Sequence, residues 1–410
     1  MRMHRNLVEA VLRGLQQIFQ EGVYADKAVE RLLKSDKRWG KRDRGFVAET
    51  VYEIVRWKRL YAEIAEVREP FSRDDWFRIF AVWAVLRGHA LPPWKEFTDT
   101  PQRRIKGRFD ALIKTRKLRE SIPDWLDELG EKSLGTRLWE AELAALNQPA
   151  PVVLRTNTLK TTREALAEAL QAEDFNASPL PDYPDALLLA ERGNVFATRA
   201  FAEGWFEVQD ASSQRVAPLL QAEPGMRVID CCAGAGGKTL HLAALMQNKG
   251  QLLAMDLYSN KLAELKRRAR RAGAFNIETR QPDSPKVLKR LQGTADRVLI
   301  DAPCTGLGVL RRNPDAKWKL QPEFLKTVCD TQAELLRRYS KLLKPGGKLV
   351  YATCSILPQE NGRQVADFLA SEAGREFRLM EEHPIYASES GHDGFYLALM
   401  QRLPEGPKTA

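Results

Sequence analysis

The feature that most limits the possible folds is a regular alternation of short apolar strands and helical stretches from Phe206 onward. Such alternation predicts an α/β domain with a doubly wound, mostly parallel sheet. Two further apolar stretches near the end predict a final β pair with one antiparallel strand, which completes a seven-stranded sheet. The expected strands are MRVIDCC (226–232), QLLAMD (251–256), NIETR (276–280), ADRVLID (295–301), KLVYATC (348–354), EFRLMEE (376–382) and DGFYLALMQR (393–402).

The part of the chain before this alternation has a different character. Residues 1–145 carry apolar residues at helical spacing, as in Leu7, Val8, Val11, Leu15 and Ile18, and predict an all-helical domain. PVVLRTNT and DALLLA read as strands on either side of the helical TREALAEALQA, so 146–205 is expected to be a small α+β unit. We therefore predict three domains, at 1–145, 146–205 and 206–404, which suits a chain of 410 residues.

The positive charge is concentrated in the helical part. The net charge is +10, and residues 1–120 hold an excess of basic over acidic residues that accounts for all of it. Lys and Arg gain free energy when they displace counterions from phosphates, so this excess favours RNA binding. A basic face that only keeps the protein in solution is the alternative.

Other sequence features bear on location and metal binding. The start MRMHRNLVEA has no apolar signal-peptide core, and no apolar stretch is long enough to span a bilayer, so we expect a cytoplasmic protein without a membrane partner. The five cysteines form no C-x-x-C pair, and the five histidines are scattered, so neither a disulfide framework nor a metal site is expected.

A glycine-rich turn follows the strand MRVIDCC and leads into a helix. Three glycines let the backbone approach a ligand closely, and the helix N-terminus favours anionic groups. A Walker A loop is excluded because Cys232 stands where its first glycine is required. The dinucleotide fingerprint also fails, since Thr239 occupies the position of its third glycine.

Three aspartates follow successive strands of the predicted sheet: Asp256, Asp283 and Asp301. Each on its own could cap a helix. Ligands of open α/β sheets bind at the carboxyl ends of the strands, where an acid can hold ribose hydroxyls. Together the aspartates indicate a rim that binds a cofactor with an adenosine and few phosphates.

Two cysteines lie at the ends of neighbouring strands, Cys304 after the fourth and Cys354 after the fifth. A thiolate that adds to C6 of cytosine makes C5 nucleophilic enough to accept a methyl group, and a base then removes the C5 proton. The target base must leave its stack to reach such a pocket. Lys238 and Asp301 are expected to hold that base and tune the thiols. Two buried cysteines without a reaction are the alternative.

Ordered motifs along essentially the whole chain resemble those of the RsmB/Sun family of RNA cytosine-5 methyltransferases. The matching elements are QDASSQ (209–214), DCCAGAGGKT (230–239), Asp256, Asp283, DAPCTGLG (301–308), RRNPD (311–315), YATCSILPQEN (351–361) and HDGFYLA (392–398). The resemblance implies a methyltransferase (Rossmann-like) sheet. Two departures, Ala233-Gly234-Ala235 for the usual Ala-Ala-Pro and Lys261 for an arginine, affect the geometry of the turn and not the reaction.

The resemblance also implies the cofactor and the roles of residues. S-adenosylmethionine would be held by Cys232, Ala233, Gly234, Ala235, Gly236, Gly237, Lys238, Asp256, Asp283 and Asp301. Cys354 would be the nucleophile, and Cys304 would assist release of the methylated RNA, with Asp301 and Lys238 completing the catalytic set.

For RNA, the helical part looks like a NusB-like domain, and the small α+β unit looks like the family's RNA-contacting subdomain. The residues expected to bind RNA are Arg38, Arg42, Arg44, Arg56, Arg155, Asn157 and Arg311. The expected partner is ribosomal RNA, with 16S RNA favoured, or an assembling small subunit, bound by a monomeric enzyme. Three alternatives stay open: a tRNA methyltransferase, a non-catalytic assembly factor on the same fold, and a nicotinamide-dependent reductase, against which the missing third glycine counts.

Overall fold

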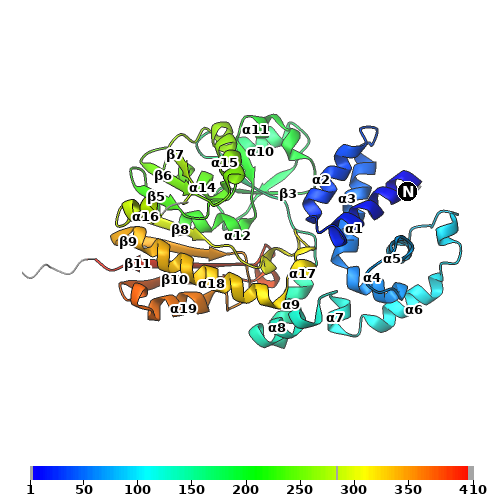
Figure 1. Cartoon of the computed structure of the whole chain (residues 1–410). Helices are drawn as coiled ribbons and strands as arrows, with labels where there is room; N and C mark the ends of the chain where they lie inside the picture. Colours follow the sequence, from blue (N-terminus) through cyan, green and yellow to red (C-terminus); the bar gives the residue numbers. More distant parts are fainter. Residues whose placement is uncertain (1–2, 283–284, 405–410) are drawn as a thin grey trace, which may run out of the picture. The chain divides into compact units, whose positions relative to one another are not determined.

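Residues 3–282 and 285–404 are described in the computed structural model, and they form two units. The first unit contains Met1–Gln148 together with Leu310–Pro322, and the second contains Pro149–Val309 together with Glu323–Ala410. Figure 1 shows that the first unit is helical, whereas the second contains both sheets of the protein.

The first unit confirms the helical prediction for the start of the chain. Its helices are α1 (Arg5–Phe19), α2 (Ala25–Ser35), α3 (Lys41–Arg56), α4 (Lys58–Ala65), α5 (Arg73–Leu86), η1 (Lys95–Phe97), α6 (Gln102–Leu112), α7 (Arg116–Arg119), α8 (Asp124–Leu134), α9 (Thr136–Leu146) and α17 (Ala316–Lys319).

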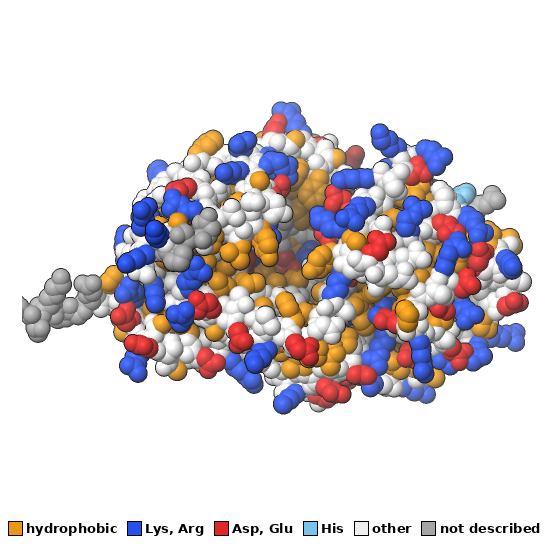
Figure 2. Space-filling view, viewed as in Figure 1, with side chains coloured by type: hydrophobic (Ala, Val, Ile, Leu, Met, Phe, Trp, Pro, Cys, Tyr) orange, Lys and Arg blue, Asp and Glu red, His pale blue; other side chains and the backbone are white. Residues whose placement is uncertain are grey.

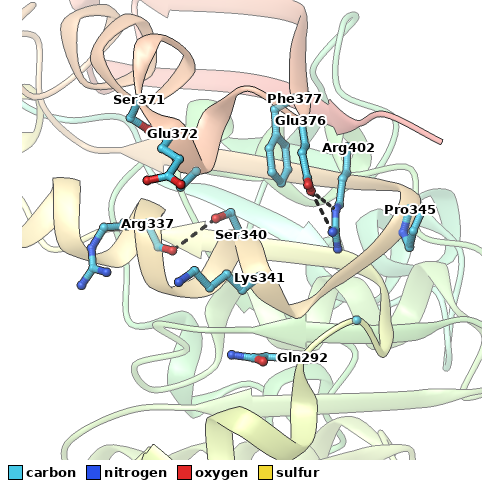
Figure 3. A pocket seen from close by; sticks show the side chains of 12 residues that line it. Gln292, Arg337, Ser340, Lys341, Pro345, Ser371, Glu372, Glu376, Phe377 and Arg402 are labelled. Carbon is cyan, nitrogen blue, oxygen red and sulfur yellow. Dashed lines mark hydrogen bonds and ion pairs between the residues drawn. The ribbon is translucent and has the colours of Figure 1, made fainter. Parts of the chain in front are cut away.

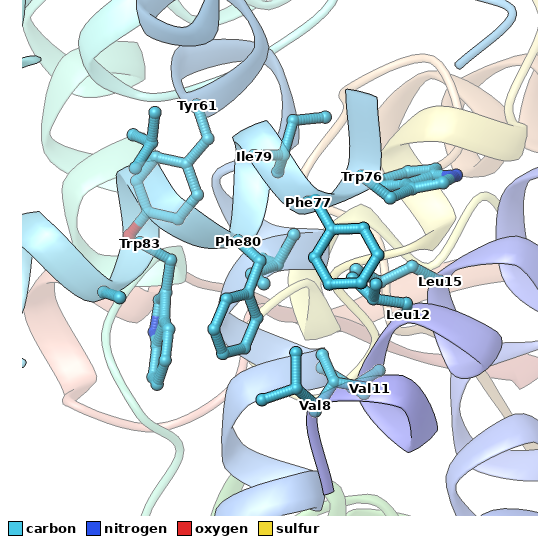
Figure 4. Packing of buried hydrophobic residues seen from close by; sticks show 14 of the residues in the cluster. Val8, Val11, Leu12, Leu15, Tyr61, Trp76, Phe77, Ile79, Phe80 and Trp83 are labelled. Atoms are coloured by element: carbon cyan, nitrogen blue, oxygen red, sulfur yellow. The ribbon is translucent and has the colours of Figure 1, made fainter. Parts of the chain in front are cut away.

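Helix α5 forms the centre of the core of this unit. Its start is fixed by a capping box, in which Ser72 Oγ accepts from the Asp75 N–H and the Asp75 carboxylate accepts from the Ser72 N–H. Buried side chains follow on all its sides, and Phe80 and Trp83 pack with their ring centroids 5.1 Å apart. Figure 4 shows Phe77 and Phe80 of α5 facing Val8 and other apolar side chains of α1, whose helical spacing therefore reflects burial.

The segment Leu310–Pro322 belongs to the helical unit although it lies far away in the sequence. Asp315 Oδ2 accepts from the N–H of Ala25 (3.0 Å), at the start of α2. Trp318 Nε1 donates to the carbonyl of Val55 (2.7 Å) near the end of α3. The sequence placed this segment in the third domain; these hydrogen bonds instead incorporate it into the first unit.

The second unit begins with a small antiparallel sheet in the order β2-β3-β1-β4. Its apolar face packs on Leu166 and Leu170 of α10. Strand β4 pairs with β1 although it starts at Phe206, so this sheet extends past the boundary predicted at 205. The elements are β1 (Val153–Thr156), α10 (Arg163–Gln171), β2 (Ala177–Pro179), β3 (Ala186–Leu189), η2 (Val195–Ala197), α11 (Arg199–Ala202) and β4 (Phe206–Val208).

The large sheet has seven strands in the order β10-β11-β9-β8-β5-β6-β7, as expected. Strand β11 is antiparallel to both of its neighbours, and the other pairs are parallel. The strands are β5 (Arg227–Asp230), β6 (Gln251–Met255), β7 (Ile277–Arg280), β8 (Ala295–Asp301), β9 (Leu343–Thr353), β10 (Phe377–Ile385) and β11 (Phe395–Arg402).

Helices cover both faces of this sheet (Figure 1). One face packs on α13, α14 and α15, and the other packs on α16, α18 and α19. Each central strand is buried on both sides, which explains its nearly continuous apolar sequence. The remaining elements are α12 (Ala211–Gln214), α13 (Val216–Leu219), α14 (Gly237–Leu245), α15 (Ser259–Ala272), α16 (Pro285–Leu291), η3 (Leu307–Val309), α18 (Pro322–Tyr339), η4 (Ser340–Leu342), α19 (Gly362–Ala370), η5 (Glu372–Gly374) and α20 (Ala387–Ser390).

Candidate active site

The candidate site lies at the carboxyl ends of the central parallel strands. Strand β8 lies between β5 and β9, and the register pairs Asp301 with Ala352. The loop after Asp301 and the loop after Thr353 therefore start side by side. The order of the strands changes direction at β5, which is where open α/β sheets bind their ligands.

The structure brings the two predicted thiols into contact: Cys304 Sγ and Cys354 Sγ lie 3.3 Å apart. The hydrogen bond to Cys354 and burial both raise the pKa of Cys304 well above its ordinary value. Cys304 therefore stays protonated in the free protein, in contact with the Cys354 sulfur atom.

The other three cysteines are not suited to attack. Burial raises the pKa of both Cys231 and Cys232 well above the ordinary value, and it raises the pKa of Cys329 to about 11. A thiol that stays protonated is a poor nucleophile.

Lys238 and Asp301 form an ion pair next to the thiols, with Nζ and Oδ2 2.6 Å apart. Burial lowers the pKa of Lys238, but the Asp301 carboxylate and the neighbouring Cys354 raise it by more, so its pKa lies above the ordinary value. The ammonium group thus stays charged and is held by the carboxylate. It is therefore not available to bind a phosphate group.

The glycine turn runs from Cys232 to Gly237 as predicted, and it is fixed from outside by two arginines. Arg155 of β1 donates to the carbonyl of Gly237 (2.6 Å), and Arg268 of α15 donates to the carbonyl of Ala235 (2.8 Å). Gly236 has φ +89°, and a Cβ there would lie 2.6 Å from Leu265. Glycine is therefore required at this position for both conformation and packing.

The turn and the neighbouring strand end fit the adenosine and short charged tail of S-adenosylmethionine. Asp256 lies at the end of β6, and its carboxylate accepts from the N–H groups of Gly234 and Tyr258, each at 2.9 Å. Each carboxylate oxygen keeps a lone pair for a ribose hydroxyl. Leu257 and Tyr258 beside it are exposed apolar side chains, and nothing lies within 4 Å of a Cβ built on Gly234. Asp283, the third predicted acid of the rim, lies outside the described residues.

Asp230 is a site residue that the sequence reasoning missed. It ends β5 directly before the turn, is buried, and accepts from Thr239 Oγ1 at 2.7 Å. Burial raises its pKa to about 7. Its position as a fourth acid at a strand end was the signal that could have identified it.

Most of the residues predicted to bind RNA are used inside the protein. The side chains of Arg155 and Asn157 are buried, and Asn157 Nδ2 donates to the carbonyls of Gly204 and Ala272. This burial does not fit RNA contact, and we withdraw that assignment for both. The physical reason is that β1 and the residue after it pack inside the unit. Arg155 is bonded there to the glycine turn, and Asn157 is bonded to the end of α15.

In the helical unit the predicted arginines divide into two groups. Arg44 donates to the carbonyl of Trp39 (3.0 Å), Arg56 donates to that of Arg311 (2.9 Å), and buried Arg311 donates to that of Ala145 (2.8 Å). These three side chains brace the unit. The side chains of Arg38 and Arg42 are exposed, and Arg38 is paired with Asp36 at 2.7 Å.

Two searches across the described residues bear on other partners. Within 3–282 and 285–404, no cluster of His, Cys, Asp and Glu could hold a metal ion. Over the same ranges, no helix has the length and apolar character that crossing a membrane requires.

An open cavity of about 860 Å³ lies far from the thiols, at the edge where β8 and β9 begin. Figure 3 shows Arg402 of β11 paired with Glu376 across part of it, at 2.8 Å.

Comparison with known proteins gives a consistent result. The family described as "16S rRNA methyltransferase RsmB/F" matches residues 217–402, and the "Methyltr_RsmF/B-like, ferredoxin-like domain" matches residues 122–196. The second match begins before the small sheet and ends before β4.

Two curated relatives and one solved structure are similar to this chain. Ribosomal RNA small subunit methyltransferase B of Pseudomonas syringae is 31% identical over 88% of this chain and 90% of its own. Probable ribosomal RNA small subunit methyltransferase B of Synechocystis is 39% identical over 61% of this chain and 56% of its own. The structure of NSun6 from Pyrococcus horikoshii with SFG shares the fold, with a TM-score of 0.64 at 22% identity over 70% of this chain and all of its own.

The Pseudomonas relative covers 88% of this chain, so the similarity extends into both units and is not confined to the large sheet. Together with the match over 217–402, it shows that the chain belongs to the RsmB/F family of 16S rRNA methyltransferases.

Proposed function

We propose that the protein methylates carbon 5 of a cytosine in small-subunit ribosomal RNA, with Cys354 as the nucleophile. The observation that carries the proposal is the pair of sulfur atoms 3.3 Å apart, beside the ion pair of Lys238 and Asp301. S-adenosylmethionine is the cofactor and supplies an electrophilic methyl group to C5.

The two thiols act in sequence on a base that has left its stack. Cys354 adds as a thiolate to C6, and electron density moves to C5, which then carries the new methyl group. The bond from Cys354 to C6 removes the hydrogen bond between the two sulfur atoms, which is the largest cause of the raised pKa of Cys304. Cys304 then passes its own proton to water more readily, and as a thiolate it takes the proton from C5. The electron pair of the C5–H bond restores the C5–C6 double bond, and Cys354 leaves C6 as a thiolate.

Lys238 and Asp301 hold the base in this proposal. The Asp301 carboxylate is an acceptor suited to the exocyclic amino group of cytosine, and uracil has no such donor. Lys238 holds that carboxylate in place through a charge-assisted hydrogen bond of 2.6 Å. The pair thus contributes base selection as well as electrostatic stabilisation.

The names of the relatives favour ribosomal RNA over transfer RNA. The helical unit is the proposed RNA-binding part, with exposed Arg38 and Arg42 as its contacts. A monomeric enzyme that acts in the cytoplasm on RNA or on an assembling small subunit completes the proposal.

Covalent trapping tests the reaction. Wild type, Cys304→Ser and Cys354→Ser are incubated with S-adenosylmethionine and a 16S ribosomal RNA transcript, and denaturation-resistant protein–RNA adducts are measured. We expect Cys304→Ser to accumulate an adduct and Cys354→Ser to form none. An adduct that depends on Cys304 would exchange the roles of the two thiols. Methylation of a tRNA transcript alone would move the substrate to tRNA, and no adduct or methylation with either RNA would favour the non-catalytic assembly factor.

A further inference from the structure

The loop between β9 and α19 contains a fully buried acid, Glu360, that has no part in the reaction described above. Its Oε2 accepts from the N–H of Thr305 at 2.8 Å and from Gln332 Nε2 at 3.1 Å. Its Oε1 accepts from Thr305 Oγ1 at 2.5 Å and from Ser355 Oγ. One carboxylate therefore receives four hydrogen bonds, which matches its full capacity as an acceptor.

The donors to Glu360 are the residues next to the two thiols. Thr305 directly follows Cys304, and Ser355 directly follows Cys354. Gln332 Nε2 also donates to the carbonyl of Pro303 (2.9 Å), the residue before Cys304.

Asn361 extends this arrangement on the Cys354 side. Its Oδ1 accepts from Thr353 Oγ1 at 2.6 Å, and its Nδ2 donates to the carbonyl of Ser355 at 2.9 Å. The residues before and after each thiol are thus tied to the 360–361 segment or to Gln332. The buried carboxylate is the group that both loops share.

A buried carboxylate is costly unless every lone pair is used, and an apolar side chain would fill the same space at lower cost. Its retention here is explained by where its donors come from. They anchor two loops whose separation sets the distance between the sulfur atoms. The same carboxylate is among the causes that raise the pKa of Cys304.

We propose that Glu360 is a positioning residue, which sets the distance between Cys304 and Cys354 by holding the residue after each thiol. This inference rests on the proposed function for the roles of the thiols, whereas the geometry it describes does not. Loss of the carboxylate should let the two sulfur atoms separate. Cys354 could then still attack a base, but release by Cys304 would be slowed.

The first test measures the distance between the thiols without RNA. Diamide accepts two electrons and two protons, becoming a hydrazine, while two neighbouring thiols form one S–S bond. The Cys304–Cys354 disulfide is followed by peptide mass spectrometry. We expect Glu360→Ala to form it about tenfold more slowly than wild type, since displacements of about 1 Å have effects of this order or larger.

Two conservative variants keep the test decisive if Glu360→Ala does not fold. Glu360→Gln retains one acceptor oxygen, and the hydroxyls of Thr305 and Ser355 can turn to accept from its amide, so its rate should lie between those of wild type and Glu360→Ala. Ser355→Ala removes one of the four bonds and should also be slowed. The control is Glu334→Gln on α18, whose side chain is half exposed and pairs with Arg337. Rates equal to wild type in folded Glu360→Gln and Ser355→Ala would overturn the proposal.

The second test measures the release of RNA. In the trapping experiment, Glu360→Gln should accumulate a covalent RNA adduct although both thiols are intact, a result that simple loss of stability would not give. If Glu360→Gln forms the disulfide more slowly but no variant, including Cys304→Ser, forms an adduct, the positioning role is supported and the result counts against the proposed function. If Cys304→Ser accumulates an adduct, but Glu360→Gln neither forms the disulfide more slowly nor accumulates an adduct, the positioning role alone is overturned.

Discussion

At the residue scale, the chemistry depends on which of five thiols can ionise. Burial keeps Cys231, Cys232 and Cys329 protonated, and contact with Cys354 does the same for Cys304. The environment of each sulfur atom therefore separates Cys354, the proposed nucleophile, from four thiols that stay protonated in the free protein.

Cys354→Ala should abolish methylation and leave the affinity for S-adenosylmethionine nearly unchanged. Loss of a nucleophile typically lowers the rate by roughly 10³-fold or more. Transfer of a radiolabelled methyl group measures activity, and calorimetric titration measures cofactor binding. Cys329→Ala on α18 is the matched control and should retain activity. Methylation by Cys354→Ala at the wild-type rate would show that another group attacks the base.

Asp301→Asn should lower the pKa of Lys238 below its ordinary value. Burial already acts in that direction, and the Asp301 carboxylate is the main group that opposes it. Reductive ¹³C-methylation of lysines followed by NMR titration measures the pKa in the variant and in wild type. An unchanged pKa would mean that other charges hold the ammonium group.

The buried carboxyl of Asp230 makes stability depend on pH. Its pKa is about 7 in the folded protein, against a reference value of 3.8. Between these values the unfolded state has released a proton that the folded state retains. The free energy of unfolding should therefore decrease as pH rises from about 4 to about 7 and then become constant with respect to this group.

Asp230→Asn removes this titration and keeps an oxygen that can accept from Thr239 Oγ1. Urea unfolding at about pH 5 and about pH 7.5 should show a smaller difference in the variant than in wild type. An equal difference in both proteins would assign the pH dependence to other groups.

At the scale of elements, close backbone packing holds the Cys354 loop. Gly308 donates its N–H to the carbonyl of Cys354 (2.9 Å) and accepts from the N–H of Gly394 (2.7 Å). A Cβ on Gly308 would lie 2.1 Å from the carbonyl oxygen of Gly394 and 2.9 Å from that of Cys354. These are backbone atoms, which cannot move without shifting the loop.

Gly308→Ala should therefore lower methylation by about 10²-fold or more, the scale expected when a catalytic group moves by about 1 Å. Gly107→Ala is the control, because an added Cβ meets nothing within 4 Å on the exposed face of α6. Initial rates of methyl transfer and thermal unfolding are measured for both. Full activity in Gly308→Ala would show that the loop adjusts without moving the thiol.

Elements also show how local sequence patterns can mislead about domain membership. Phe206–Val208 was expected to open the large domain, but it pairs with β1 in the small sheet. Leu310–Pro322 was expected in the same domain and packs in the helical unit. Neither assignment follows from periodicity, because partner choice depends on contacts between distant residues.

At the scale of the whole molecule, the excess of positive charge is not all available to RNA. Figure 2 shows Lys and Arg side chains scattered among acidic ones over the visible surface. Several arginines of the helical unit donate to carbonyl oxygens, among them Arg44 and Arg56. Counting charges in the sequence therefore overstates the number of phosphate contacts.

The double variant Arg38→Gln/Arg42→Gln should weaken RNA binding. It should also reduce the slope of log affinity against log salt concentration by about one to two, since each phosphate contact contributes about 0.9 to that slope. Arg44→Gln should instead lower the free energy of unfolding, because its guanidinium braces the helical unit. Affinity at several salt concentrations separates the two effects. Arg378→Gln on β10, whose partner is Gln401, is the surface control. An unchanged slope in the double variant would mean that these two arginines contact no phosphate.

The sequence by itself determined the class of the fold, and it predicts which groups react. Strand and helix periods are local properties, so the seven strands of the large sheet were predicted near their observed positions, while the short strands β2 and β4 were missed. Cys304, Cys354, Lys238 and Asp301 follow from ordered motifs at strand ends, and the structure brings all four together.

Only the tertiary structure decided what each side chain contacts. Arg155 and Asn157 look like surface residues in the sequence, but both side chains are buried and donate to the carbonyl groups of Gly237 and Gly204. Glu360 has no local signature, and the burial of both Glu360 and Asp230 is produced by loops and helices that are distant in the sequence. Sequence patterns give the period of apolar residues and the type of each residue, whereas burial and hydrogen-bond partners depend on long-range packing. That packing also sets the distance between the two thiols.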